Sequence, residues 1–88
     1  MTEKVAIVTG GSRGIGKAVV FELARNGAKV VFTYLNSEDS ARTICEDVSK
    51  LGGEVVALKA DIRSFDEAKS VAQETLKRFG TIDILVNN

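Results

Sequence analysis

The feature that most constrains the fold of this chain is a glycine-rich turn between a short apolar run and an amphipathic helical pattern. The turn covers residues 9–16, Thr-Gly-Gly-Ser-Arg-Gly-Ile-Gly, and the apolar run covers residues 5–8. A strand, a turn and a helix in this order aim backbone N–H groups and the positive end of a helix at one point. Gly10, Gly14 and Gly16 let the chain turn sharply and approach a pyrophosphate where a Cβ would collide.

The spacing of these glycines separates three nucleotide-binding motifs. The general dinucleotide fingerprint, G-x-G-x-x-G, does not occur in that order. Gly11, Gly16 and Lys17 fit a Walker A loop, but the next residue is Ala18, which offers no hydroxyl to a Mg²⁺ ion. Phosphate transfer is therefore a weak interpretation, and the pattern that remains is T-G-x-x-x-G-x-G.

Composition limits the class of protein. The chain has 88 residues, enough for one small domain, and its 12 basic and 12 acidic residues give a formal net charge of zero. This balance does not favour nucleic acid or an anionic membrane as a partner, and the apolar runs are too short to span a bilayer. The absence of histidine and the single cysteine, Cys45, argue against a metal site and exclude an internal disulfide. We expect a cytoplasmic protein in which Cys45 is a buried or half-buried filler.

Apolar periodicity predicts four strands that alternate with three helices. The predicted strands are residues 4–9, 29–34, 54–60 and 82–87, and the predicted helices are residues 15–26, 38–51 and 65–79. Because each crossover is long enough to return to the same end of the sheet, the strands are expected to be parallel. Right-handed crossovers then give a doubly wound α/β sheet with strand order 3-2-1-4. The first two helices are expected on one face of the sheet and the third on the other.

Local residues predict where the helices begin and end. Gly27 and Gly80 are natural stops after the first and third helices, and Ser37 is a plausible N-cap of the second. Ser64 and Glu67 have the spacing of a capping box at the start of the third helix. The residues expected to face the core are Ile15, Ala18, Val19 and Leu23, then Ala41, Ile44, Val48 and Leu51, and finally Ala68, Val71, Ala72, Thr75 and Phe79.

The pattern at residues 9–16 resembles the turn of the classical short-chain dehydrogenase/reductase family, and the resemblance extends over the whole chain. Residues 26–31, Asn-Gly-Ala-Lys-Val-Val, are similar to the family's entry to its second strand, and Asp61-Ile62 follows the third strand as in the family. Residues 82–88, Ile-Asp-Ile-Leu-Val-Asn-Asn, resemble the fourth strand and the start of the Asn-Asn-Ala-Gly motif. Among family branches, the turn looks most like that of 3-oxoacyl-[acyl-carrier-protein] reductases. The same turn also occurs in sugar and steroid dehydrogenases.

The resemblance implies an NADP(H) site at the first crossover. The position where NAD-preferring members carry an acidic residue is occupied by Tyr34, so a 2′-phosphate would meet no repulsion there. Arg13 could pair with that phosphate, and NADP(H)-dependent members often carry a basic residue at this place. Asn36 stands near where many have a second basic residue. The residues expected to contact the cofactor are Gly10, Ser12, Arg13, Gly14, Ile15, Gly16, Asn36, Asp61, Ile62 and Asn88.

The resemblance gives some of these residues particular roles. Asp61 and Ile62 look like the family pair that holds adenine, in which the carboxylate accepts from the exocyclic amine and the next backbone N–H reaches a ring nitrogen. An alternative for Asp61 is that it caps a turn before the third helix. In family members, Asn87 ties neighbouring strands together and Asn88 lies against the adenosine ribose. Thr9 is expected to fix the turn through a hydrogen bond of its hydroxyl.

The family transfers hydride between a nicotinamide and a carbonyl or alcohol carbon of a small molecule, using a Tyr, a Lys four residues later and a Ser. Tyr34 is the only tyrosine here and Glu38 lies four residues after it, so no catalytic residue is predicted within residues 1–88. We expect this chain to be the dinucleotide-binding part of one longer Rossmann domain, truncated after the fourth strand. Such a piece is expected to be inactive alone and part of a homo-oligomer when full length. A non-catalytic nucleotide-binding module and an inert fragment remain as alternatives.

Overall fold

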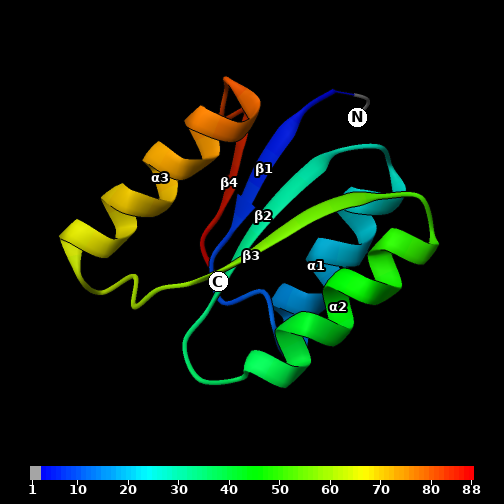
Figure 1. Cartoon of the computed structure of the whole chain (residues 1–88), viewed down its shortest axis with the longest axis horizontal. Helices are drawn as coiled ribbons and strands as arrows, with labels where there is room; N and C mark the ends of the chain where they lie inside the picture. Colours follow the sequence, from blue (N-terminus) through cyan, green and yellow to red (C-terminus); the bar gives the residue numbers. More distant parts are fainter. Residues whose placement is uncertain (1–2) are drawn as a thin grey trace.

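The computed structural model describes residues 3–88, so Met1 and Thr2 of the expected domain 1–88 lie outside the described residues. Strands and helices alternate along the chain (Figure 1). The strands are β1 (Val5–Val8), β2 (Lys29–Tyr34), β3 (Glu54–Lys59) and β4 (Ile84–Val86), and the helices are α1 (Gly14–Arg25), α2 (Glu38–Lys50) and α3 (Phe65–Phe79). The predicted bounds of β2 and α3 are confirmed, and those of β3, α1 and α2 differ by one residue at one or both ends.

The two strands nearest the chain ends are shorter than predicted. Strand β1 begins one residue later and ends one residue earlier, and β4 loses two residues at its start and one at its end. At the start of β4, the Asp83 carboxylate accepts a hydrogen bond from the Val5 N–H over 2.9 Å, while the Asp83 N–H donates to the Val5 carbonyl over 2.8 Å. A side chain thus takes the place of one backbone partner, which ends the regular ladder there.

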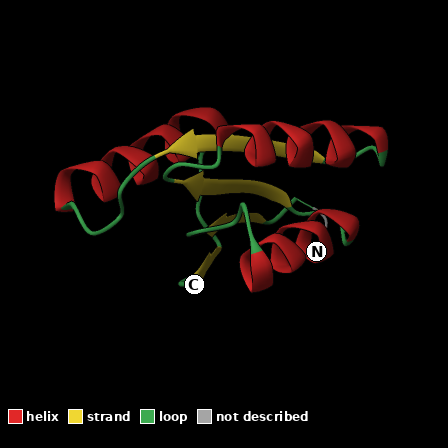
Figure 2. Ribbon diagram, turned by 90° about the horizontal axis from the view of Figure 1, so that it is seen from below, coloured by secondary structure: helices red, strands yellow, loops and turns green. Residues whose placement is uncertain are grey.

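All neighbouring strands are parallel, and their order is β3-β2-β1-β4, which confirms the doubly wound α/β fold. Val31 at the middle of the sheet is opposite Ile7 on one side and Val56 on the other. In the view of Figure 2 the strands are stacked one above another, with the C-terminus of the chain beside the last of them. Parallel strands end at the same edge, so the loops after all four strands meet on one side of the molecule.

The two faces of the sheet carry alternate strand residues, as the pleat requires. Val8 and Phe32 pack towards α1 and α2, where Val20 and Ile44 complete a buried cluster. Their neighbours along the strands, Ile7 and Val31, face α3 and form a smaller cluster with Ala60, just after β3, and Val71 of α3. Figure 1 shows α3 on one side of the strands and the other two helices on the opposite side, as predicted.

The predicted core face of α1 is wrong in part. Ile15 is 76% exposed and Ala18 is also exposed, whereas Gly16 and Val20 are the buried residues of this helix. Val19 and Leu23 are partly buried against the cluster. The reason is that Gly16 is pressed against the preceding turn, which fixes the rotation of the helix and brings the residue one turn later, Val20, into the core.

The second helix also differs from the prediction at its two ends. Ser37 occupies the N-cap position but its side chain makes no capping hydrogen bond. Leu51 lies just beyond the last helical residue and is 71% exposed, so it does not continue the stripe of Ala41, Ile44 and Val48. Between these ends, Cys45 is half-buried as expected, and burial raises the pKa of its thiol.

The capping box predicted at α3 is only half formed. The Ser64 hydroxyl accepts from the Glu67 N–H over 3.3 Å, as the motif requires. The Glu67 carboxylate, however, accepts from the N–H of Asp61 over 2.8 Å instead of that of Ser64. At the other end, Gly80 adopts a left-handed φ of 82° and stops the helix as predicted. Within residues 3–88 no helix has the length and apolar character needed to cross a membrane.

Candidate functional site

The turn after β1 needs glycine at two positions because of its backbone angles. Gly10 has φ of 67° and Gly14 has φ of 57°, both in the left-handed region that residues with a Cβ rarely adopt. A Cβ added to Gly14 would meet nothing within 4 Å. The space beside Gly14 is therefore open, so another molecule could come close to the backbone there.

Two other glycines of the turn are required by close packing. A Cβ on Gly16 would overlap the Gly10 carbonyl oxygen and lie 2.7 Å from Nδ2 of Asn88. A Cβ on Gly11 would lie 2.6 Å from the Cβ of Phe32. Neither distance is possible between real atoms, so glycine at position 11 lets the turn lie against β2, and glycine at position 16 lets α1 begin against Gly10 and Asn88. The need for glycine at position 11 was not predicted, because it depends on Phe32, which is distant in the chain.

Hydrogen bonds attach the turn to the strands on either side of β1. The Gly10 N–H donates to the Thr33 hydroxyl and the Gly11 N–H donates to the Thr33 carbonyl, each over 3.0 Å. On the other side, the Thr9 N–H donates to the carbonyl of Val86 in β4 over 3.0 Å. The first half of the turn is thus held by β2 and β4 before the helix begins.

The two asparagines after β4 lie against the same turn, and in Figure 1 the C-terminus is drawn beside the loop after β1. The Asn88 N–H donates to the Thr9 hydroxyl over 3.0 Å, and the Asn88 side-chain amide donates to the Gly10 carbonyl over 3.1 Å. The Thr9 hydroxyl has acceptors in the Val86 carbonyl at 3.3 Å and the Asn87 side-chain oxygen at 3.4 Å. Thr9 therefore fixes the turn through its hydroxyl, as expected.

The start of α1 presents backbone N–H groups that have no partner in the described part of the chain. Arg13 is the N-cap residue, has extended backbone angles and makes no side-chain capping bond. The first helical hydrogen bond runs from the Lys17 N–H to the Arg13 carbonyl over 3.2 Å. Within residues 3–88, the N–H groups of Gly14, Ile15 and Gly16 have no acceptor. Unpaired N–H groups together with the positive end of the helix make a site suited to an anion.

Beside the turn, a cavity of about 240 Å³ opens at the carboxyl edge of the sheet. It brings together four residues expected to contact the cofactor, and its lining consists of Gly10, Thr33, Tyr34, Leu35, Ala60, Asp61, Ile62, Arg63 and Asn88. These residues come from the ends of three strands and from the segment after β4. A largely apolar hollow with a few polar groups at its rim is typical of a small-molecule site.

The other expected contact residues lie outside this cavity. Ser12, Arg13, Gly14, Ile15 and Gly16 belong to the adjoining turn and the first residues of α1, with Ser12 buried and Arg13 exposed. Asn36 lies in the exposed bend that follows the lining residue Leu35. The expected residues thus form two adjacent groups, one at the helix start and one around the cavity.

Asp61 is held by its neighbour Arg63. One carboxylate oxygen, Oδ1, accepts from the Arg63 backbone N–H and from its Nε, each over 3.0 Å, and Oδ2 accepts from the terminal guanidinium nitrogen over 2.9 Å. The Arg63 guanidinium, with help from the backbone N–H, lowers the pKa of Asp61. The turn-capping role considered for Asp61 is therefore present, although it uses Arg63 and not the start of α3. Arg63 was not predicted as part of the site, and its only signal in the sequence is a charge opposite to that of Asp61 two residues away.

No described residue neutralises the positive charge of Arg13 in the turn. Among the described residues Arg13 forms no ion pair. The end of β2 carries Tyr34, Leu35 and Asn36, so no carboxylate stands beside the cavity on that side. In the described part of the chain no group of three or more His, Cys, Asp or Glu side chains could hold a metal ion.

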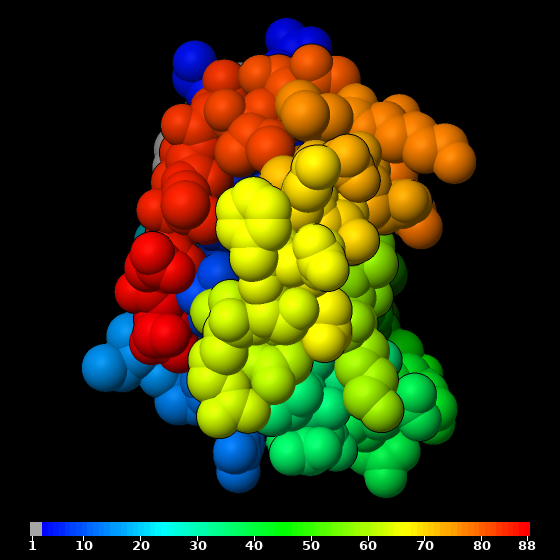
Figure 3. Space-filling model, turned by 90° about the vertical axis from the view of Figure 1, so that its left-hand side faces the viewer, coloured from blue at the N-terminus to red at the C-terminus, as the bar shows by residue number. Residues whose placement is uncertain are grey.

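A second hollow, of about 250 Å³, lies between α3 and β4. Figure 3 shows it as the gap between the residues coloured red near the C-terminus and those coloured yellow at the start of α3. Its lining is mostly aliphatic and includes Ile7, Val71, Ile82 and Leu85. It offers few polar groups with which to orient a ligand.

Sequence comparison gives consistent matches over the whole chain. A family model described as short chain dehydrogenase matches residues 4–88. The hydroxynaphthalene reductase-like protein Arp2 of Metarhizium robertsii is 46% identical over 88 residues, which cover 100% of this chain and 33% of that protein. A short-chain dehydrogenase/reductase of Pestalotiopsis microspora is 45% identical over 85 residues, covering 97% of this chain and 32% of its own length.

Comparison with solved structures also matches this chain to dehydrogenases. A short-chain dehydrogenase/reductase from Serratia marcescens matches with a TM-score of 0.95 and 46% identity, over 99% of this chain and 36% of that one. A 7α-hydroxysteroid dehydrogenase, solved with NADH and 7-oxo glycochenodeoxycholic acid, matches with a TM-score of 0.93 and 38% identity, over 99% of this chain and 34% of that one. The chain therefore spans about a third of the length of the relatives that it matches.

Proposed function

The chain belongs to the short-chain dehydrogenase family, and on that premise we propose that it is the NADP(H)-binding part of a cytoplasmic oxidoreductase. The whole enzyme would transfer hydride between the nicotinamide and the carbonyl or alcohol carbon of a small molecule. The observation that carries the proposal is the start of α1, where three consecutive N–H groups have no acceptor among the described residues. They lie beside a turn in which glycine leaves the backbone accessible.

This helix start fits the diphosphate of a dinucleotide. The N–H groups of Gly14, Ile15 and Gly16 can donate to phosphate oxygens, and the positive end of α1 adds attraction for a dianion. A side chain at Gly14 would project into open space that the ligand needs. The bonds from Gly10 and Gly11 to Thr33 hold the turn in this shape before the ligand arrives.

The neighbouring cavity fits the adenosine half of the cofactor. Asp61 would accept from the exocyclic amine of adenine, and the Ile62 N–H, which has no acceptor within residues 3–88, would donate to a ring nitrogen. Asn88 would lie against the ribose, since its side chain already rests on the Gly10 carbonyl at the rim of the cavity. The diphosphate and adenosine sites adjoin at Gly10, as one continuous ligand requires.

We assign the preference for NADP(H) over NAD(H) to the charges around the turn. Arg13 is exposed and free of ion pairs in the described residues, and it would pair with the 2′-phosphate. Ser12 and Asn36 are weaker candidates for the same phosphate. A related 7α-hydroxysteroid dehydrogenase was solved with NADH, so family membership alone does not imply NADP(H). The NADP(H) preference proposed for this chain therefore depends on Arg13 and on the absence of a carboxylate at position 34.

The chemistry of the whole enzyme would be completed outside these 88 residues. Bound nicotinamide supplies or accepts the hydride, and the residues of this chain bind and orient it. The proposed substrate class is a carbonyl or alcohol compound such as a 3-oxoacyl group carried on acyl-carrier protein, with sugar- or steroid-type substrates as the alternative. We also propose that the 88 residues form part of a single longer Rossmann domain, are inactive alone, and belong to a homo-oligomer when full length.

The test compares two cofactors in the full-length protein. Arg13→Ala should weaken NADPH binding about ten- to a hundredfold, because a charge-assisted hydrogen bond contributes about 1.5–3 kcal/mol. NADH, which lacks the 2′-phosphate, should bind almost as before. Dissociation constants from the fluorescence of the reduced nicotinamide give both values.

Arg25→Ala is the matched control, because Arg25 lies at the opposite end of the same helix and pairs with Glu22. It should leave both affinities unchanged. Equal losses of NADPH and NADH affinity in Arg13→Ala would contradict the assignment of the 2′-phosphate. A wild-type protein that binds neither cofactor would contradict the proposed function itself.

A further inference from the structure

Two oppositely charged residues, Asp61 and Arg63, lie beside each other in the lining of the cavity proposed to hold adenosine. Asp61 and Arg63 both line the cavity, and three hydrogen bonds of 2.9–3.0 Å join them. Two of these come from Nε and a terminal nitrogen of the guanidinium, which grip both carboxylate oxygens. Such a fork fixes the plane of the carboxylate, which a single contact would leave free to rotate.

The backbone around the pair is also held in place. The Asp61 N–H donates to the Glu67 carboxylate over 2.8 Å, and the Asp61 carbonyl accepts from the Ser64 N–H over 3.0 Å. The backbone and the carboxylate of Asp61 are therefore both fixed, by Arg63 and Ser64 of the loop before α3 and by Glu67 of its first turn. This is more restraint than an exposed ion pair usually has.

Counting acceptor sites shows what the carboxylate can still do. An ionised carboxylate offers roughly two acceptor sites on each oxygen. Oδ1 already accepts twice, from the backbone N–H and from Nε of Arg63, whereas Oδ2 accepts once. The remaining site on Oδ2 is available to a further donor, and Oδ2 belongs to a residue that lines the cavity.

Building on the proposed function, in which Asp61 accepts from adenine, we propose that Arg63 is a positioning residue that holds the Asp61 carboxylate so that Oδ2 receives the exocyclic amine of the base. Arg63 itself does not need to touch the cofactor. By holding Asp61, Arg63 makes the enzyme prefer adenine, which carries the exocyclic amine, over a purine without that amine.

The pair contributes little to stability, so its effect on ligand binding can be tested separately from folding. The Arg63 side chain is 82% exposed, and exposed ion pairs contribute little to folding because water and salt screen them. Replacing Arg63 should therefore leave the protein folded, and a change in ligand selectivity would not come from unfolding.

The experiment measures binding of two cofactors to wild-type protein and to Arg63→Gln in the full-length enzyme. The cofactors are NADPH and its analogue in which purine replaces adenine, so that the ring nitrogens remain and only the amine is missing. Wild-type protein should prefer NADPH, and Arg63→Gln should lose about two- to tenfold in NADPH affinity, the value of one hydrogen bond. The affinity for the purine analogue should not change, and Arg63→Lys should restore part of the preference.

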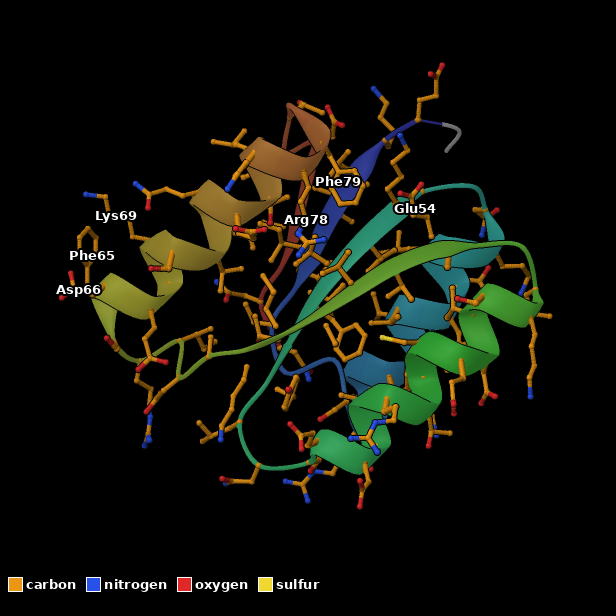
Figure 4. All side chains as sticks on the ribbon, in the orientation of Figure 1. Glu54, Phe65, Asp66, Lys69, Arg78 and Phe79 are labelled. Atoms are coloured by element: carbon orange, nitrogen blue, oxygen red, sulfur yellow. The ribbon has the colours of Figure 1, made fainter. Side chains whose placement is uncertain are left out.

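Arg78→Gln is the matched control. Arg78 forms an ion pair with Glu74 over 2.7 Å near the far end of α3, away from the cavity lining (Figure 4). Arg78→Gln removes the same charge as Arg63→Gln and likewise breaks an ion pair of an arginine with a carboxylate. It should leave both affinities unchanged.

The pH dependence gives an independent readout. Arg63 lowers the pKa of Asp61, so the carboxylate stays ionised, and able to accept, down to a lower pH than it would alone. Binding of NADPH should weaken as pH falls through that pKa. In Arg63→Gln the pKa of Asp61 returns upward, so the same weakening should begin at a higher pH, whereas the purine analogue should show no such difference.

Each other outcome overturns the proposal in a recognisable way. Equal losses for NADPH and the analogue in Arg63→Gln would mean that Arg63 only supports the loop. A wild-type protein that binds NADPH and the analogue equally would overturn the contact between Asp61 and the amine, and the role of Arg63 with it. No binding of NADPH by wild-type protein would overturn the proposed function as well.

Discussion

The two faces of the sheet are covered unequally. On one face, two helices close over Val8, Phe32 and their neighbours, and Val20, Ile44 and Val48 there are almost completely inaccessible to solvent. On the other face a single helix, α3, covers a smaller cluster and leaves the hollow of about 250 Å³ beside β4 (Figures 1 and 3). The same sheet is therefore densely packed on one side and partly open on the other.

The two halves of the proposed cofactor site differ in the same way, since one rests on the dense face and the other lies in a surface loop. The turn that would hold the diphosphate rests on the dense face, where Phe32 and Val20 leave no room for a Cβ at Gly11. Asp61, proposed to accept from adenine, and Arg63, proposed to position it, belong to the loop before α3 and are held by hydrogen bonds near the surface. Mutations on the dense face should thus act through folding, and mutations in the loop before α3 through ligand selectivity.

The largest effect expected from this comparison is on stability. Phe32→Ala should lower the free energy of unfolding by about 3–5 kcal/mol, because it leaves a cavity between β2 and two helices. Val71→Ala, on the α3 face, should cost only about 1–2 kcal/mol, the value of two methyl groups beside an existing hollow. Urea unfolding followed by circular dichroism measures both.

Phe32→Leu keeps the measurement possible if Phe32→Ala does not fold. It retains most of the side-chain volume and should cost less than about 1.5 kcal/mol. Equal losses in Phe32→Ala and Val71→Ala would contradict the view that the two faces are packed to different degrees.

The smallest effect on stability is expected at β4, the strand at one edge of the sheet. Leu85 is 61% exposed on β4, the last strand of the sheet, and lines the second hollow. Leu85→Lys should change the free energy of unfolding by less than about 0.5 kcal/mol and reduce aggregation of the 88-residue chain, because a charge on an edge strand discourages pairing with other chains. Light scattering during storage measures the aggregation.

Leu51→Lys is the control, because Leu51 is also an exposed leucine, at 71%, but it is the C-cap residue of α2 and belongs to no strand. It should leave aggregation unchanged. A similar reduction in both variants would show that added charge alone, and not the edge of β4, is responsible.

The sequence was sufficient to predict the order of the elements and of the strands. Strand β2 and helix α3 have sharp local signals, an apolar run after Gly27 and a helix between Ser64 and Gly80, and their bounds are confirmed. Strand order followed from the alternation of strands and helices, which depends on chain length and handedness more than on particular side chains.

The errors of prediction arose where distant segments decide a local feature. The face of α1 is set by the contact between Gly16 and the Gly10 carbonyl, so a periodicity count that began at Ile15 gave the wrong rotation. The Glu67 carboxylate had two N–H groups within reach, and spacing alone could not tell that it would accept from Asp61. The fork of Arg63 on Asp61 depends on side-chain geometry that the sequence does not contain.

The most direct measurement of the central claim is a structure of the full-length protein with NADP⁺ bound. The account predicts diphosphate oxygens about 2.7–3.2 Å from the backbone nitrogens of Gly14, Ile15 and Gly16, the usual range for N–H donors. It also predicts adenine in the cavity beside Asp61 and Ile62. A diphosphate bound elsewhere, for example in the hollow between α3 and β4, would contradict the account.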